Sequence, residues 1–499
     1  MKLKRIITAA FTALLLPIGA ISADTDQGYA AFSASGDVNG DGYANIADIV
    51  TLQNWLLCRT DSYLADWSAG DLCGNGKLDV FDLCLLKRLV FTQQPEIENN
   101  EFIPSQISQF GAPTPTTGNV RALNIYVDFA DVKYADYDYD TEQIREELYG
   151  NGAVAPPYES LTAWFERSSY GNLHLEGDVV HYTCSGNMAD YSQGRYNYTP
   201  MATEVLKGLE DELDFSDYDS NGDGAIDCLT FTVPLDYASD EMKDFWYACT
   251  NHWYGDQYFT IDGMRVEQYI IMDVMPNPND MKYLKSTMIH EMCHSMGLPD
   301  YYAYDSDPYD GVNDGGESLK GDAGYECMDD AIGDLCSFSK LMFGWLRENE
   351  VQSYSGYGEQ TFILDDASQT GSCLILPINS TPGDYTSEYF LIENISRSGN
   401  NFHYYTYDSG VRIFHVKAEL NQYQFKYENY SPYFMGNDKV RVLRLVNDDG
   451  GFYHSGDTVG FGTSNFAAYD YNGYPTIDTG YTVSIGEHSD GKYTITVSK

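Results

Sequence analysis

Basic residues are scarce in this chain. It has 29 Lys and Arg against 75 Asp and Glu over 499 residues, a formal net charge of −46 at pH 7. This excess of negative charge excludes partners held through phosphate groups, so we expect neither nucleic acid nor an anionic membrane to bind. Several aspartates lie in short Asp/Asn/Gly loops, where bound cations would neutralise part of the charge.

Long apolar runs are absent after the N-terminus, and this excludes a later membrane-spanning helix. At the N-terminus, Lys2, Lys4 and Arg5 precede an apolar run over Ile6–Ala20. The run is short for a spanning helix, and Ile21-Ser22-Ala23 offers a cleavage site behind it. We therefore predict a signal peptide over residues 1–23 and a secreted mature protein without membrane attachment.

The ten cysteines do not indicate a disulfide framework. In an exported chain they permit five bridges, but their spacing dictates no pairing. Cys58, Cys73 and Cys84 leave an odd number in the N-terminal part. Cys293 lies in a predicted helix and is more typical of a buried thiol than of a metal ligand.

Residues 37–48 form an oxygen-rich loop. Oxygen side chains stand at loop positions 1, 3, 5, 9 and 12, and Gly42 stands at the turn position 6. A short loop of this kind wraps a calcium ion and continues into a helix, here expected over Ile49–Leu57. The predicted calcium ligands are Asp37, Asn39, Asp41, Asn45 and Asp48.

A second copy of this loop starts at Asp71, 34 residues after the first, and a helix is expected over Leu83–Val90. Position 3 is Cys73, a soft ligand that calcium does not favour. The second site is therefore weaker, or completed by water or a backbone carbonyl. Its predicted ligands are Asp71, Asn75, Asp79 and Asp82.

Two features distinguish this pair of loops from EF-hands: position 12 is Asp instead of Glu, and no helix precedes either loop. The segment 36–91 resembles a dockerin module, and the run Lys77–Arg88 resembles dockerins of ruminococcal cellulosomes. The resemblance implies a small all-α calcium-binding module that docks onto a cohesin of a scaffoldin, outside the cell. The alternative is a calcium-stabilised helix pair with no partner. The implied contact residues are Ile46, Ala47, Val80 and Phe81.

Residues 92–118 lose hydrophobic periodicity and collect Pro, Gln, Asn, Ser and Thr, ending in Pro-Thr-Pro-Thr-Thr-Gly at 113–118. This composition is typical of a linker between domains.

The run His290-Glu291-Met292-Cys293-His294 predicts a catalytic zinc site. On a helix, His290 and His294 project from one face about a turn apart, and Glu291 beside them is placed to act as a general base. Gly297 allows the chain to leave the helix, and Asp300 returns as a third ligand. Three protein ligands with an open position are typical of a catalytic site, and the implied chemistry is peptide-bond hydrolysis.

The elements around this motif are expected to alternate between strand and helix. They are a strand over Ala122–Phe129, a helix over Thr141–Leu148, the turn Ser168–Gly171 and a strand through Val179 and Val180. This order and H-E-x-x-H-x-x-G-x-x-D resemble the immune-inhibitor-A family of secreted metallopeptidases, a metzincin group. The resemblance implies an α+β metzincin-like domain over 119–348 that binds Zn²⁺ and hydrolyses proteins. It also implies a methionine beneath the metal, for which Met328 is the candidate.

Two alternatives apply to these residues. In thermolysin-like enzymes the third ligand is a Glu on a later helix, and Glu317 and Glu326 lie at suitable distances along the chain. Glycines surround both, which disfavours a helix there, so Asp300 is preferred. Met328 is otherwise an ordinary core methionine.

A third oxygen-rich loop precedes a predicted strand over Leu229–Val233. We interpret it as a structural calcium site of the catalytic region, and the alternative is a solvated Asx turn without an ion. Its predicted ligands are Asp219, Asn221, Asp223 and Asp227.

Residues 349–499 carry short alternating runs, which predict a β-rich, antiparallel C-terminal domain. The expected strands include Thr361–Leu364, Tyr389–Glu393, Gly410–Val416 and Tyr493–Val497. This domain packs onto the catalytic region or, alternatively, binds carbohydrate through its tyrosines. The leading function is a secreted zinc endopeptidase on a cellulosome. The alternative is a catalytically inactive, dockerin-tethered module that binds protein or carbohydrate.

Overall fold

The computed structural model describes residues 36–40, 44, 46–59, 62–93, 100–107, 114–133, 140–150, 159–191, 198–234, 249–252, 259–274, 281–302, 326–330, 333–379, 383–402, 408–420, 425, 440–447, 451–462 and 466–499. The predicted signal peptide lies outside these residues. Within them, no helix combines the length and apolarity needed to cross a membrane. The chain forms two compact units, Met1–Glu98 and Asn99–Lys499.

The first unit contains the helices α2 (Ile46–Leu56) and α3 (Val80–Gln93), with a short 3₁₀ turn, η1 (Ser68–Gly70), between them. Both helices begin three residues earlier than predicted, because the last residues of each loop already form the first helical turn. Each turn therefore contains the loop's final aspartate, where the helix dipole favours negative charge. The small core consists of Val38, Ile49, Leu52, Ala69 and Leu86.

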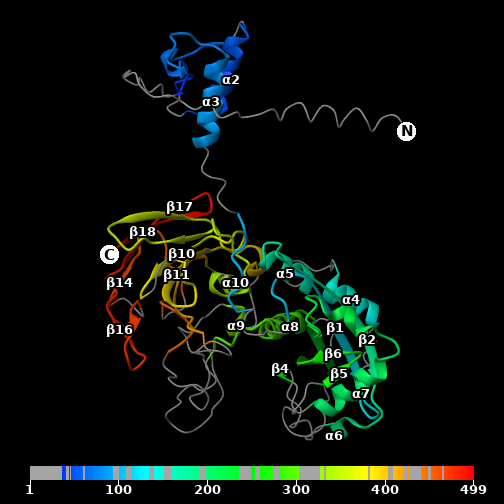
Figure 1. Ribbon diagram of the computed structural model, residues 1–499. Coiled ribbons are helices and arrows are strands. Elements are labelled where there is room, and N and C mark those ends of the chain that lie inside the picture. The colour runs from blue at the N-terminus through cyan, green and yellow to red at the C-terminus, as the bar shows by residue number, and fades with distance from the viewer. Residues whose placement is uncertain are drawn as a thin grey trace, which may run out of the picture. The chain divides into compact units, whose positions relative to one another are not determined.

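The second unit contains a five-stranded sheet in the order β2-β1-β3-β7-β4 (Figure 1). All neighbours pair in parallel except β4, which is an antiparallel edge strand beside β7. The sequence patterns predicted β1, β2 and β3 but not β7 or β4. The strands span Gly118–Asp128 (β1), Leu173–Thr183 (β2), Cys228–Pro234 (β3), Cys249–His252 (β4) and Gln268–Val274 (β7).

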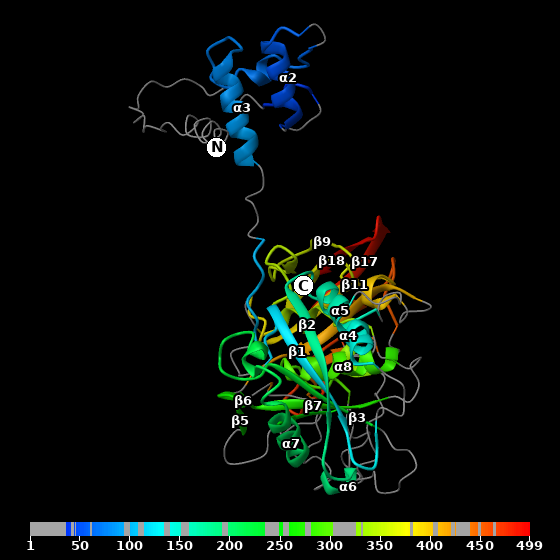
Figure 2. The ribbon, with the colours of Figure 1, turned by 90° about the vertical axis from the view of Figure 1, so that its right-hand side faces the viewer.

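Both faces of this sheet are covered, because its strands alternate between two cores. Along β7, Ile270 and Met272 join the core that contains α8, whereas Tyr269 and Ile271 join the core that contains α7. Side chains of a strand point alternately to opposite faces, so one strand supplies both cores. Helices α4 (Thr141–Tyr149), α5 (Leu161–Ser168) and α8 (Met281–Ser295) cover one face, and α7 (Thr199–Leu209) covers the other (Figure 2).

The C-terminal part consists mainly of two sheets, in the orders β13-β12-β11-β10-β8 and β14-β17-β18-β9. Their pairings are antiparallel except for β8 with β10, so the predicted antiparallel region is confirmed with one parallel exception. The strands span Val351–Ser353 (β8), Gln360–Leu364 (β9), Cys373–Pro377 (β10), Glu388–Ile395 (β11), Gly410–Lys417 (β12), Leu443–Leu445 (β13), Thr458–Gly460 (β14), Thr482–Ser489 (β17) and Lys492–Ser498 (β18).

The first of these sheets contributes to two cores. Phe390 and Ile392 of β11 join the core shared with the second sheet, whereas Tyr389 and Leu391 join the core that contains α8 and α10 (Ser337–Phe343). The C-terminal part therefore packs onto the region with the zinc motif, as predicted from Gly410–Val416. In Figures 1 and 2, α8 lies between the parallel sheet and these strands.

The remaining elements are short. They are α6 (Met188–Tyr191), η4 (Phe215–Tyr218), β5 (Phe259–Ile261), β6 (Met264–Val266), α9 (Cys327–Asp330), η7 (Gly399–Asn401), β15 (Ala468–Tyr469) and β16 (Pro475–Ile477).

Part of the segment predicted as a linker packs onto the second unit. The backbone N–H of Ile103 donates to Leu346 O at 2.8 Å, and the hydroxyl of Thr116 donates to Phe343 O at 2.8 Å. Gly344 ends α10 with φ 82°, and a Cβ there would lie 2.7 Å from the backbone nitrogen of Ser105. Only glycine permits this close approach, so the segment is anchored before β1 begins.

Candidate metal centre

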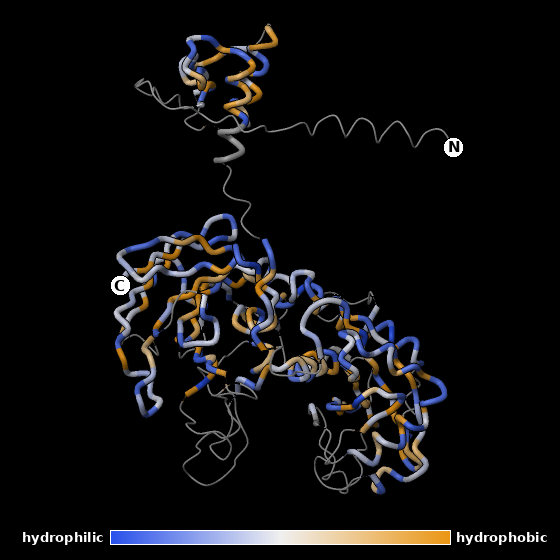
Figure 3. Tube along the Cα trace, in the orientation of Figure 1, coloured by the Kyte–Doolittle hydropathy of each residue, from blue (hydrophilic) through white to orange (hydrophobic). Residues whose placement is uncertain are grey.

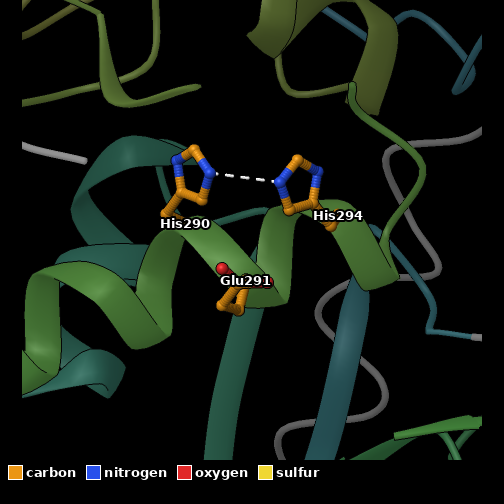
Figure 4. A group of neighbouring side chains, drawn as sticks. All are labelled: His290, Glu291 and His294. Carbon is orange, nitrogen blue, oxygen red and sulfur yellow. Dashed lines mark hydrogen bonds between the residues drawn. The ribbon is translucent and has the colours of Figure 1, made fainter. Parts of the chain in front are cut away.

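The last two turns of α8 present His290 and His294 from one face of the helix (Figure 4). Gly297 follows with φ 110°, and its N–H donates to His294 O at 2.9 Å. This left-handed residue is where the sequence predicted the chain to leave the helix. The turn then brings Asp300 back to the two imidazoles.

Three side-chain atoms converge at this point. The Nε2 atoms of His290 and His294 are 3.1 Å apart, and Asp300 Oδ1 lies 2.9 Å from the first and 3.1 Å from the second. Ligands of a tetrahedral zinc ion are about 3.4 Å apart, from metal–ligand distances of about 2.1 Å. The three donors thus have nearly the separation of zinc ligands. That they hold zinc stays a prediction.

The other nitrogen of each ring is held by a backbone carbonyl. His290 Nδ1 donates to Cys327 O at 2.8 Å, and His294 Nδ1 donates to Leu298 O at 2.8 Å. Because a carbonyl only accepts, each Nδ1 carries the proton and each Nε2 directs a lone pair at the common point. The ring orientation needed for metal binding is therefore built into the protein.

Electrostatics favour a cation between these groups. Burial by itself lowers the pKa of His294. The nearby charge of Asp300 outweighs this effect and raises the pKa to about 9. Burial raises the pKa of Asp300, and the two imidazoles more than reverse this, so its pKa lies well below the usual range. Without a cation, three acceptor atoms would face one another at hydrogen-bond distance. A proton or a metal ion satisfies them.

The candidate base Glu291 lies next to these ligands. A carboxylate oxygen of Glu291 and one ring nitrogen each of His290 and His294 lie within 4.8 Å of one another. The hydroxyl of Thr250, on the edge strand β4, donates to Glu291 Oε2 at 3.1 Å and to Glu291 O at 2.9 Å. Thr250 was not predicted, because no sequence pattern links β4 to a helix 40 residues later.

The alternative ligand Glu326 has a different role. Its buried carboxylate accepts the N–H groups of Met328 and Cys336 and the hydroxyl of Ser339 at 2.8 Å. These bonds brace the turn whose Cys327 carbonyl holds His290. Glu326 is thus occupied by the backbone, which favours Asp300 as the third ligand, and Glu317 lies outside the described residues.

Met328 is buried in the same turn, next to the carbonyl that holds His290. Tyr301 N donates to Met328 O at 2.9 Å, which ties the turn to the residue after Asp300. The predicted methionine therefore lies in the turn that holds His290 in place.

The third oxygen-rich loop is closed by its own carboxylates. Asp219 accepts the N–H groups of Gly222, Asp223 and Gly224 at 2.8–3.0 Å, and Asn221 Oδ1 accepts Asp223 N at 2.9 Å. Asp227 is buried at the start of β3, and burial raises its pKa to about 7. Its Oδ1 has no hydrogen-bond partner among the described residues. A calcium ion would stabilise this charge, and the site stays a prediction.

The two N-terminal loops share a hydrogen bond from the backbone of position 3 to the aspartate at position 12. Asn39 N donates to Asp48 Oδ1 at 3.0 Å in the first, and Cys73 N donates to Asp82 Oδ1 at 3.0 Å in the second. Both position-12 aspartates are fully buried. Asp41 and Asn45, which were predicted ligands, lie outside the described residues.

Hydrophobic residues alternate with hydrophilic ones along the chain of this module (Figure 3), and several of the hydrophobic side chains are exposed. Of the predicted contact residues, Val80 is 60% and Phe81 69% exposed, and Ala47 is also exposed. The side chain of Ile46 is not among those described. Further apolar residues are exposed on α2, directly after it and on α3: Val50, Leu57 and Leu85.

Residues 35–91 match the family model of the dockerin type I domain. This part of the chain is a dockerin module. A dockerin binds calcium, and its presence supports attachment to a cohesin and an extracellular, cellulosome-associated location. The module accounts for the paired loops and for the exposed apolar helix residues.

No curated protein matches the chain. Among solved structures it is similar to OgpA from Akkermansia muciniphila in two crystal forms, both at 11% identity. The first match covers 66% of this chain and 88% of OgpA with a TM-score of 0.24. The second covers 72% and 95% with a TM-score of 0.25. These scores are too low to establish a shared fold.

Proposed function

We propose that the chain is a secreted zinc-dependent endopeptidase held on a cellulosome scaffold by its dockerin. One observation carries the enzymatic part: His290 Nε2, His294 Nε2 and Asp300 Oδ1 meet within 3.1 Å of one another, beside the carboxylate of Glu291.

The residues present fit a catalytic zinc ion. Two imidazoles and one carboxylate are a donor set that zinc takes, and three protein ligands leave a position for a reactant. The side chain of His294 is 20% exposed, whereas those of His290 and Asp300 are 7% and 6% exposed. Access from solvent on the His294 side supports a catalytic site over a closed structural one.

A zinc ion bound there would supply Lewis acidity toward water and toward a substrate carbonyl. Glu291 provides the proton transfers. Its carboxylate, oriented by the Thr250 hydroxyl, accepts a proton from the attacking water and returns it to the leaving amine of the cleaved bond. His290 and His294 are held by their Nδ1 bonds and so need no reorientation during the reaction.

A peptide substrate is favoured by the position of β4. Among the described strands, β4 lies at the edge of the sheet, where an extended peptide would pair with its outer side. Because Thr250 belongs to β4 and contacts Glu291, a peptide bound along this edge would lie close to the base.

The decisive experiment combines metal analysis with digestion of an unstructured protein such as casein. The wild-type chain should contain one zinc ion and cleave casein. Glu291→Gln should retain zinc and lose about 10²–10⁴-fold in rate, the usual contribution of a general base. Glu176→Gln, at an exposed position of β2, is the matched control and should remain active.

An active Glu291→Gln variant would contradict the mechanism. A wild-type chain that contains zinc but cleaves nothing would favour the inactive binding module. Calcium must be present throughout, so that loss of the dockerin fold is not mistaken for loss of zinc.

A further inference from the structure

The second dockerin loop does not fit the ion that its family implies. The two loops carry the same number of carboxylates: Asp37, Asp41 and Asp48 in the first, and Asp71, Asp79 and Asp82 in the second. The number of carboxylates therefore does not distinguish the two loops. The difference is the donor atom at position 3, an amide oxygen in Asn39 and a sulfur in Cys73.

The backbone places these two side chains equivalently. In each loop the N–H of position 3 donates to Oδ1 of position 12 at 3.0 Å. Cys73 therefore occupies the place that the first loop gives to a ligand. Calcium takes oxygen ligands almost without exception, whereas thiolates select zinc and other soft ions.

The sulfur lies within the group of candidate ligands. Ligand atoms of Asp71, Cys73 and Asp82 all lie within 4.8 Å of one another. Cys73 Sγ is 3.8 Å from Asp71 Oδ1. Sulfur and oxygen ligands of a tetrahedral zinc ion are about 3.6 Å apart, from Zn–S of about 2.3 Å and Zn–O of about 2.1 Å. The observed separation is close to that value.

We propose that the second dockerin loop is a mixed sulfur–oxygen site that prefers a soft divalent cation over calcium, with Cys73, Asp71 and Asp82 as its ligands. The first loop keeps the all-oxygen set that calcium takes. Binding of the soft ion converts the Cys73 thiol to a thiolate and releases its proton to solvent. The module then holds two different ions in two loops of equivalent backbone.

The test is a Cd²⁺ titration of the full chain in excess calcium and a phosphine reductant, followed by ultraviolet thiolate-to-cadmium charge-transfer absorption. Histidine and carboxylate ligands do not produce this band, so the candidate zinc centre does not interfere. The wild-type chain should develop the band. Cys73→Ser should lose it, and Cys84→Ser, which removes an exposed thiol of α3 outside the loop, should keep it.

Calcium binding gives a second readout. Cys73→Asn provides the second loop with the donor of the first, and calorimetry should find one more calcium site than in the wild type, or an affinity at that site raised about tenfold or more. The proposal is overturned if the wild type shows no band, if Cys73→Ser keeps it, or if Cys73→Asn leaves calcium binding unchanged.

Discussion

The dockerin loops and the candidate zinc centre support their ligands in different ways. In each loop, the groups that orient the aspartates are backbone N–H groups of the same twelve residues, as with Asn39 N and Asp48. At the zinc centre, the ligands are also close in sequence, but their support is remote. Cys327 O holds His290, and Thr250 on another strand holds Glu291.

This difference shows what each site depends on. A loop that orients its own ligands needs little beyond a small core. Among the described residues, the buried core of the module consists of Val38, Ile49, Leu52, Ala69 and Leu86. The candidate zinc centre requires the packed residues 326–330 and 333–336 and the strand β4. Substitutions that disrupt the large core of the second unit should therefore weaken metal binding at the candidate zinc centre and leave the dockerin module unaffected.

The largest expected effect is loss of a zinc ligand. Asp300→Asn should weaken zinc binding by more than about 100-fold, since even outer partners of metal ligands contribute about 10–100-fold. Proteolysis should fall with it. Metal analysis after dialysis checks this, with Asp365→Asn on the surface as control. Unchanged zinc content in Asp300→Asn would return Glu317 or Glu326 to consideration.

A substitution in the first dockerin loop should affect the dockerin module and leave casein cleavage by the second unit nearly unchanged. Asp48→Ala removes a fully buried carboxylate that accepts Asn39 N, and we expect the module to lose calcium and cohesin binding, by about 100-fold or more. Cleavage of soluble casein should change less than about twofold, because the second unit has hydrophobic cores of its own. Reduced cleavage would show that the two regions are coupled.

The third prediction concerns the stability of the second unit as pH changes. Buried Glu388 accepts from His415 Nε2 at 2.9 Å and from Lys417 Nζ at 2.8 Å. Burial raises its pKa, but these two partners lower it to a net value of about 2, from an ordinary 4.5. The stabilisation is therefore complete above about pH 4.5 and disappears as the pH falls through about 2.

Glu388→Gln should lower the free energy of unfolding of the second unit by about 2 kcal/mol near neutral pH. Denaturant unfolding of both proteins should show this difference shrinking below pH 4.5. Cohesin binding by the variant should equal that of the wild type. A difference that grows toward low pH would contradict the assigned direction of the pKa shift.

The smallest effect is expected from the turn behind the zinc ligand. Glu326→Gln replaces one of the two accepting carboxylate oxygens by an NH2 group, which cannot accept the backbone N–H that it then faces, and this loosens the Cys327 carbonyl. Zinc affinity should fall about tenfold, well short of the loss in Asp300→Asn. A competition assay against a zinc chelator measures both variants, and a reversed order would identify Glu326 as a ligand.

Much of the local structure was predictable. The four-residue spacing of His290 and His294, the glycine at 297 and the loop spacings each depend on contacts within one turn. The strands β7 and β4 and helix α7 were missed, since their short or mixed patterns do not separate strand from helix. Thr250 and the Cys327 carbonyl carry no motif, because any threonine or any peptide group could supply those bonds.

By itself, the sequence determined the local sites: which residues stand on one face of α8, which loops carry oxygen or sulfur, and that residues 35–91 form a dockerin. Short-range geometry sets these properties, since helical and loop spacings fix neighbours within a few residues. Only the tertiary structure brought Asp300 Oδ1 to the imidazole of His290, turned Glu326 toward the hydroxyl of Ser339, and placed Thr250 beside Glu291. The contact of Thr250 with Glu291 joins residues 41 apart in the chain, and that of Cys327 with His290 joins residues 37 apart, which no local pattern encodes.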